Sequence, residues 1–210
     1  MAEASIQPKA GLSSKHPARE RIIAGARRHF LSHGFRGVTM DDLATELGMS
    51  KKTLYAHFAS KNTLLEAVLH HKLHEIGKDL EQITGRRAPD FLTSLHQLLT
   101  CLQRHMDEIH PAFLRDTRRE QPELFKLVET RRQEYIQRHF GKILRNGQRT
   151  GLIRKDIPVD VIIEVLLGGV QAVVNPQKIE ELGLAPKTAL LSTIRVILEG
   201  ALAEKGRTRI

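Results

Sequence analysis

The stretch TMDDLATELGMSKKTLYAHF, residues 39–58, contains two short helical patterns separated by a turn at Gly48. Thr39 followed by Asp42 is typical of a capping box at the start of a helix. Gly48 favours a helix end because glycine adopts the left-handed backbone conformation at little cost, and Ser50 is a good cap for the helix that follows. The sequence therefore predicts a helix-turn-helix at this place.

The second of these helices has an apolar side and a basic, polar side. Leu54 and Phe58 lie about one turn apart and are expected to pack inward against a helix that begins at Pro17. Lys51 and Lys52 remain on the outer side, where they suit a duplex of nucleic acid. The alternative is an ordinary bundle with a solvated basic face. It is disfavoured because the caps, the apolar pattern and the charge agree.

The composition is that of a globular chain with a basic balance. Its 210 residues are 40% hydrophobic, and 33 Lys and Arg against 24 Asp and Glu give a net charge of +9. This charge suits nucleic acid or an acidic membrane surface. The single cysteine, Cys101, excludes a disulfide within the chain, and we find neither a signal peptide nor an apolar run long enough to cross a bilayer. We expect a soluble protein of the cytoplasm.

Helical patterns continue to the end of the chain after a disordered, basic arm at residues 1–16. The predicted fold class is all-α with nine helices, because apolar residues recur at helical spacing and Pro or Gly falls at the breaks. The expected helices cover residues 17–33, 39–47, 50–58, 60–84, 90–109, 111–119, 122–147, 158–175 and 186–204. Segment 158–175 is apolar on nearly all sides, which predicts burial on more than one face.

Residues 17–70 resemble the signature of the TetR family of bacterial regulators. The matching residues are Thr39, Leu43, Ala44, Gly48, Met49, Ser50, Leu54, Tyr55, His57, Phe58, Lys61 and Leu64. The resemblance implies a sequence-specific transcriptional regulator, a repressor released from a near-palindromic operator by a small organic effector. It implies a helix-turn-helix DNA-binding domain at residues 17–60 and a helical effector-binding and dimerisation domain at residues 61–210, with no catalytic site, cofactor or metal.

The resemblance also implies which residues contact operator DNA. The predicted set is Thr39, Ser50, Lys51, Lys52, Thr53, Tyr55, His57 and Lys61. Within it, Thr39, Tyr55, His57 and Lys61 correspond to phosphate contacts, and Lys51, Lys52 and Thr53 to positions that vary with the operator. Asp41 departs from the family pattern by its charge, and we expect it to turn away from DNA and serve only the helix dipole.

The last two helices are expected to form a four-helix interface in a homodimer. Their apolar surface exceeds what one chain of this size covers, although a self-contained core is the alternative. The predicted interface residues are Val165, Gly168, Gly169, Val173, Leu191, Ile194, Leu198 and Ala201.

The middle helices are expected to surround the effector. The predicted pocket residues are Cys101, His105, Phe113, Tyr135, His139 and Phe140, with ordinary core packing as the alternative for the aromatic group and for Cys101. Redox sensing by Cys101 is disfavoured. The spacing of Glu66, His70 and His74 on one helix permits a shared metal, but a solvated polar stripe explains it better.

Two rival functions stay open from the sequence alone. An enzyme with a helical pocket is disfavoured because no nucleophile and base, phosphate loop or metal motif has convincing spacing. An architectural protein that binds DNA without sequence preference differs from a regulator in its response to nonspecific competitor DNA.

Overall fold

The computed structural model describes residues 17–85 and 89–202, so the predicted arm at residues 1–16 lies outside the described residues. Regular structure in the described ranges is helical, apart from an isolated bridge between Ile153 and Leu202. The elements are α1 (Pro17–His33), α2 (Met40–Glu46), α3 (Lys51–His57), α4 (Lys61–Thr84), α5 (Phe91–Asp107), α6 (Pro111–Glu120), α7 (Pro122–Tyr135), the π-helical turn η1 (Ile136–Phe140), α8 (Gly141–Thr150), α9 (Val159–Val173), α10 (Pro176–Leu182) and α11 (Pro186–Ala201). The all-α prediction is confirmed.

The described ranges contain ten helical rods rather than the nine expected. One predicted helix corresponds to α7, η1 and α8, which follow one another without a break. The additional helix is α10, which is capped by Asn175 and ends at Gly183 in the left-handed conformation. The equally short α2 and α3 were predicted from their caps, and the corresponding signals of α10, Asn175 with Pro176 at its start and Gly183 at its end, were not used.

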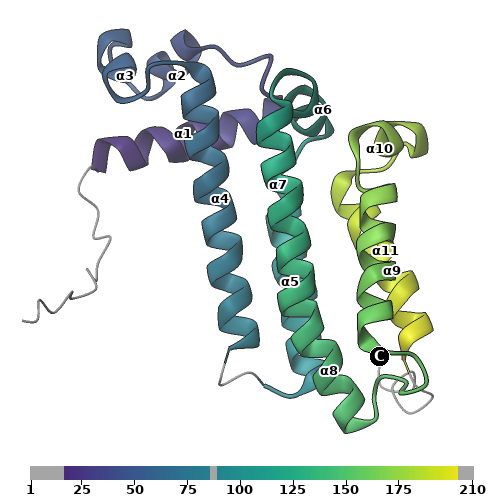
Figure 1. The fold of residues 1–210 in the computed structure, drawn as a ribbon. Helices are drawn as coiled ribbons and strands as arrows, with labels where there is room; N and C mark the ends of the chain where they lie inside the picture. Colours follow the sequence, from purple (N-terminus) through teal and green to yellow (C-terminus); the bar gives the residue numbers. More distant parts are fainter. Residues whose placement is uncertain (1–16, 86–88, 203–210) are drawn as a thin grey trace, which may run out of the picture.

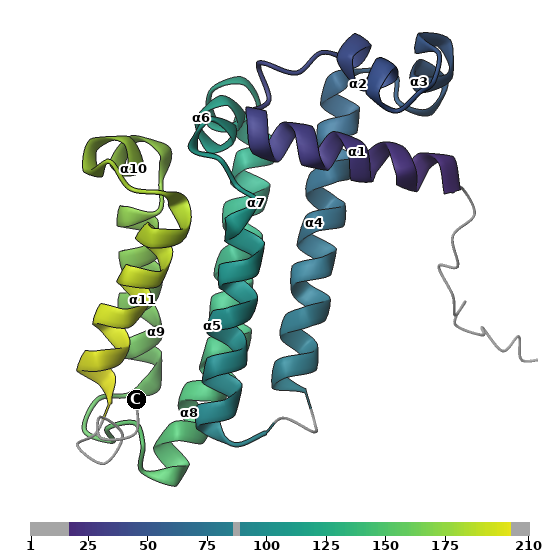
Figure 2. The ribbon, with the colours of Figure 1, turned by 180° about the vertical axis from the view of Figure 1, so that it is seen from behind.

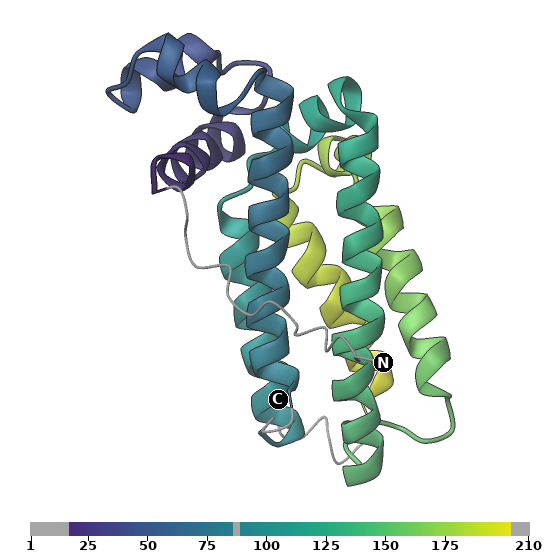
Figure 3. The same ribbon diagram turned by 60° about the vertical axis from the view of Figure 1, so that its left-hand side comes forward.

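The helices form an upright bundle with a small head at one end. In Figure 1, α4 runs the length of the bundle beside α5 and α7, and α1 crosses α4 near its start, with α2 and α3 at the same end. The opposite view shows α9 and α11 paired on the side away from α4 (Figure 2). Figure 3 shows the head of α1, α2 and α3 projecting beyond the other helices.

Two apolar clusters hold these parts together. The head cluster joins α1, α2, α3 and the start of α4, and its members include Ile22, Phe30, Leu43, Leu54 and Leu64, each nearly inaccessible to solvent. Phe113 of α6 belongs to the same cluster, so α6 is part of the base on which the head packs. The larger cluster fills the bundle between α4, α5, α8, α9 and α11.

A π-helical turn interrupts the rod from α7 to α8. Such turns insert an extra residue and often occur near functional sites. Here Ile136 and Phe140 point into the large cluster, and His139 is buried against Thr84 of α4, with 2.6 Å between Nδ1 and Oγ1. Because the Thr84 hydroxyl donates to the carbonyl of Leu80, its oxygen accepts the Nδ1 proton of His139.

In the described ranges, no individual helix has both the length and the apolar composition needed to cross a bilayer. The bent pair α9 and α10 meets this test only when the two are taken together, by length and composition alone.

Candidate DNA interface and ligand cavity

Local hydrogen bonds fix the helix-turn-helix as the sequence predicts. Thr39 accepts a hydrogen bond from the backbone N–H of Asp42, and the Asp42 carboxylate accepts one from the backbone N–H of Thr39. Gly48 has a φ of +60° in the turn. Ser50 accepts from the backbone N–H of Thr53 and so starts α3. These bonds satisfy the free backbone donors of two helices that are too short to be stable alone.

The inner side of α3 is anchored in the head cluster, which leaves its outer side in solvent. Leu54 is fully buried and Phe58, directly after the helix, is nearly so. Lys51, Lys52 and Thr53 are exposed. The helix therefore presents a basic side on a fixed support.

Two of the predicted contact residues are partly engaged within the chain. Lys51 forms an ion pair of 2.6 Å with Asp41, and this hydrogen bond raises the pKa of Lys51. The expectation that Asp41 serves only the helix dipole was therefore wrong, because Asp41 lies within reach of the first residue of α3. Lys61 places its Nζ 4.2 Å from the centre of the Phe35 ring, and burial lowers its pKa.

The other predicted contact residues surround this basic side. Thr39 and Ser50 are exposed, although their hydroxyl groups serve the helix caps. The Tyr55 side chain is exposed and His57 is half-buried. In the described ranges no carboxylate pairs with Lys52, so its ammonium group is available to a phosphate or a base.

Comparison with known proteins identifies this arrangement. A family model described as "Bacterial regulatory proteins, tetR family" matches residues 22–68. Residues 22–68 belong to the TetR family of DNA-binding domains. The chain is thus a DNA-binding transcriptional regulator, and regulators of this family are not enzymes.

Similar proteins extend the likeness beyond the matched segment. An uncharacterised HTH-type transcriptional regulator of Bacillus subtilis, YvaF, is 24% identical over 188 residues, which cover 89% of this chain and 96% of the relative. The repressor AcnR of Corynebacterium jeikeium is 27% identical and covers 78% of this chain and 84% of its own. A solved regulator of Saccharomonospora viridis in complex with choline has a TM-score of 0.67 and 21% identity, over 89% of this chain and 98% of its own. A solved TetR regulator of Haloarcula marismortui has the same TM-score of 0.67 at 20% identity, over 88% of this chain and 98% of its own, so the fold is TetR-like, with ten helical rods in the described ranges where nine were predicted.

The bundle encloses an apolar cavity of about 160 Å³. Its walls come from α4, α5, α6, α7, the π-helical turn, α9 and α11, and all but four of its lining residues are apolar. The polar ones are His105, Glu129, Arg132 and Tyr135. Burial lowers the pKa of Arg132, which is held by an ion pair of 2.6 Å with Glu129. This pair was not predictable from the sequence, because both residues lie in an otherwise polar segment of α7.

Three of the six predicted pocket residues line this cavity: His105, Tyr135 and Phe140. The other three do not. Cys101 lies one turn from His105 on α5 but faces Asp79 outside the cavity, Phe113 is in the head cluster, and His139 packs against Thr84. Helical spacing alone did not distinguish the side of each helix that faces the cavity from the sides that face other neighbours.

A charged cluster, the ion network, connects the cavity wall to α1. Its members are Arg27 of α1, Lys72, Glu75 and Asp79 of α4, and Arg104, His105 and Glu108 of α5. Glu108 accepts two hydrogen bonds of 2.8 Å from Nη2 of Arg27 and lies 3.0 Å from Nζ of Lys72. Arg27 also pairs with Glu75. The network therefore joins the head to α4 and α5.

Lys72 is the most deeply buried charge in the ion network. Its exposed fraction is only 4%, and burial lowers its pKa. Its Nζ lies 3.1 Å from Nδ1 of His105, and an ammonium group only donates, so Nδ1 accepts. Nε2 of His105 then carries the ring proton and donates to Asp79 over 2.7 Å. Both ring nitrogens of His105 are occupied, and burial lowers the pKa of this ring as well.

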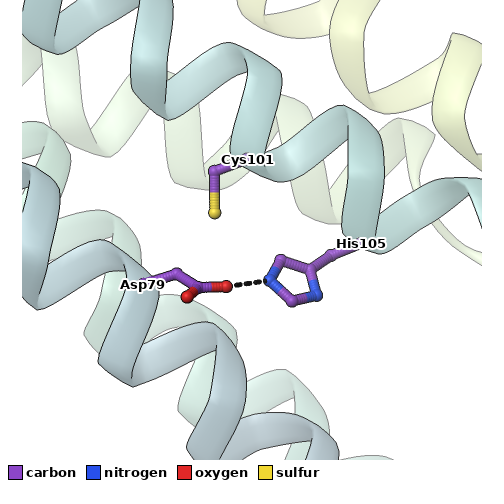
Figure 4. Close-up of side chains that lie close together, drawn as sticks. All are labelled: Asp79, Cys101 and His105. Atoms are coloured by element: carbon purple, nitrogen blue, oxygen red, sulfur yellow. Dashed lines mark hydrogen bonds and ion pairs between the residues drawn. The ribbon is translucent and has the colours of Figure 1, made fainter.

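Figure 4 shows the place where Asp79, Cys101 and His105 converge. Their possible ligand atoms lie within 4.8 Å of one another, and in the described ranges this is the one group of three metal-type ligands. Zinc uses such donors, but its histidine ligands normally donate their other ring N–H to an acceptor. Here the Lys72 ammonium occupies that position, so the cluster fits a hydrogen-bonded role better than a metal site. Burial also raises the pKa of Cys101, which favours the inert thiol.

The structure buries three of the eight predicted dimer residues within the chain itself. Ile194, Leu198 and Ala201 are buried in the chain's own core, with Ile194 only 1% exposed. Gly169 packs against Thr193 of α11. Val173 and Leu191 are half-buried, whereas Val165 and Gly168 are exposed as expected. The reason is that α11 has two apolar sides, and the sequence does not tell which one the chain itself covers.

The exposed sides of α9 and α11 form a second stripe of small and apolar residues, which we call the α9–α11 stripe. Its members are Val161, Val165, Gly168 and Ala172 on α9 and Ser192, Val196 and Gly200 on α11. Val165 is 55% exposed and Val196 72%. Side chains of this kind leave room for close approach of another helix pair.

Proposed function

We propose that this regulator represses transcription by binding a near-palindromic operator as a two-fold dimer and that a small organic effector releases it. The observation that carries the proposal is the basic outer side of α3, supported by a buried inner side. A helix held in this way fits the major groove, where side chains reach base edges. The relative AcnR carries the name repressor, which supports the same sign of regulation here. Such a role places the protein in the cytoplasm with the DNA.

The predicted DNA contacts are proposed to divide into two groups, one for base edges and one for the DNA backbone. Lys51, Lys52 and Thr53 lie in its first turn and are proposed to meet base edges or adjacent phosphates. Thr39, Ser50, Tyr55, His57 and Lys61 are proposed to contact the sugar-phosphate backbone. The pair of Lys51 with Asp41 must open for Lys51 to bind DNA, whereas Lys52 is ready to bind.

The α9–α11 stripe is the proposed dimer interface. Val196 and Val165 expose large apolar fractions in a single chain, and burial of such surface stabilises association. A two-fold dimer places two copies of α3 about 34 Å apart, one turn of DNA. We assign DNA binding to residues 17–60 and effector binding and dimerisation to residues 61–210.

Effector control is proposed to pass through the ion network. His105 lines the cavity and also holds Asp79 and Lys72, and Lys72 in turn faces Glu108, the partner of Arg27 in α1. A molecule that moves α5 therefore changes contacts on the first helix of the head. Control requires that the effector bind one head arrangement more tightly than the other, because only differential affinity shifts such an equilibrium.

Selection of bound fragments from a random DNA library tests the proposal. We expect a gapped, near-palindromic site that is bound at least about a thousandfold more tightly than random duplex at the same salt concentration. Equal affinity for the selected and the random duplex would instead indicate an architectural DNA-binding protein.

A further inference from the structure

The chemistry of the cavity wall restricts what the cavity can hold. The inference that follows rests on the proposed effector role of this cavity. Of the four polar residues in the wall, Glu129 and Arg132 form an ion pair with each other. Arg132 also donates to the carbonyl of Val174 over 3.3 Å. The wall therefore has no net charge to offer an ionic ligand.

The two remaining polar groups are also committed. Both ring nitrogens of His105 are engaged, by Lys72 and by Asp79. The Tyr135 hydroxyl donates to the carbonyl of Leu73 over 2.7 Å. A ligand that needs a hydrogen-bond donor must break one of these bonds, and a ligand with a charge must leave water without gaining a partner, which is costly.

The volume sets the size of the occupant. A cavity of about 160 Å³ is close to the roughly 150 Å³ apolar cavity that accepts benzene in an engineered protein. It is smaller than the roughly 300–1,000 Å³ of sites for drug-sized molecules. Ile76 of α4 and Leu166 and Val170 of α9 contribute aliphatic wall, while Phe125 and Phe140 supply aromatic rings.

We infer that the cavity takes a neutral, hydrocarbon-like molecule of the size of one aromatic ring. Such a molecule buries most of its surface against apolar side chains and leaves the Glu129–Arg132 pair and the two bonds of His105 intact. Charged molecules of the same shape are excluded by the lack of an unpaired counter-charge.

Three probes of the same shape test this inference: toluene, benzoate and benzylammonium. Calorimetric titration of the full chain without DNA is expected to give saturable toluene binding, with the two ions at least about tenfold weaker. Toluene is also expected to raise the melting temperature, because a ligand that binds only the folded state stabilises it. Benzoate or benzylammonium binding as tightly as toluene would overturn the inference, and so would the absence of toluene binding.

A cavity-filling variant shows whether the toluene is in this cavity. Val128 is a half-buried lining residue, so Val128→Phe adds a ring to the wall with limited strain. Leu182→Phe introduces the same ring at an exposed position of α10 and is the control. We expect Val128→Phe to weaken toluene binding at least about tenfold and Leu182→Phe to leave it unchanged. Equal toluene affinity of the two variants, with both folded by circular dichroism, would overturn the assignment.

DNA binding is measured separately, so that failure of this inference and failure of the proposed function are distinguishable. If the chain binds toluene but binds the selected and the random duplex equally, the inference stands and the regulator function is contradicted. Release from selected DNA by an ionic molecule alone supports a ligand-responsive regulator and contradicts the inference.

Discussion

Glu108 is the member of the ion network on which we expect stability to depend most. Its carboxylate accepts hydrogen bonds from Arg27 and lies 3.0 Å from the ammonium of Lys72. Burial would raise its pKa, but these two cations bring the pKa below its ordinary value. Each charge-assisted hydrogen bond contributes about 1.5–3 kcal/mol. Because the Glu108 side chain is more than a third exposed, solvent screening reduces the stabilisation from these hydrogen bonds. We therefore expect Glu108→Gln to lower the free energy of unfolding by about 2 kcal/mol.

Lys72→Met is the matched variant, and its predicted effect is smaller. Lys72 is almost fully buried and its pKa is lowered by burial, so its charge is costly to keep in the fold. Met has a similar length and fills the same space without that cost, while Glu108 keeps Arg27 as its partner. Replacing a buried ion by an apolar side chain is often close to neutral, and we expect a change within about 1 kcal/mol.

Urea unfolding followed by circular dichroism at pH 7.5 measures both changes. Since the folded-state pKa of Glu108 lies below its unfolded value, the contribution of Glu108 is present above the unfolded pKa and is lost as pH falls through the folded pKa. The difference between the parent and Glu108→Gln should therefore shrink in acid. A larger loss for Lys72→Met than for Glu108→Gln at pH 7.5 would show that the buried ammonium, and not the carboxylate, stabilises the fold.

Three further predictions concern other parts of the molecule. Burial lowers the pKa of His139 from 6.5 to about 4, so this group contributes about 3 kcal/mol of stability above pH 6.5 that is lost as the pH falls toward 4. His139→Gln should flatten that part of the curve of unfolding free energy against pH, and an unchanged slope would contradict this. Val196→Asp should give monomers by light scattering with weakened operator binding, whereas Leu182→Asp, at an exposed position outside the α9–α11 stripe, should stay dimeric. A dimeric Val196→Asp would argue against this interface. Lys61→Ala should lower the slope of log affinity against log salt by about one unit, whereas Lys155→Ala, at an exposed position outside the head, should leave it unchanged. Equal slopes for Lys61→Ala and the parent would show that Lys61 does not contact a phosphate.

Features encoded within a few neighbouring residues were predictable from the sequence. The caps at Thr39 and Ser50 and the inward side of Leu54 follow from local hydrogen bonding and helical spacing, and the structure has all three. The family followed from the same segment, which is also the part that the family model matches.

Features that depend on which helices become neighbours were not predictable. The burial of Lys72 is an example, because its partners Glu108 and His105 come from α5. For the same reason the sequence assigned Ile194 to a dimer face, although α9 and the bundle core cover it within one chain. Helical periodicity identifies an apolar side but not the surface that covers it.

Sequence-specific regulation requires that the outer side of α3 reads base pairs, and Lys52 is the lysine of this side that no carboxylate in the described ranges engages. The measurement is fluorescence anisotropy with the selected operator and with duplexes in which single base pairs are replaced, for the parent and for Lys52→Ala. We predict that the variant loses discrimination of about 1–3 kcal/mol at one or two symmetry-related positions and keeps it elsewhere. If replacement of each base pair weakens binding of the variant and of the parent equally, Lys52 does not read the operator. If Lys51→Ala and Thr53→Val also leave the profile unchanged, α3 is not the recognition helix.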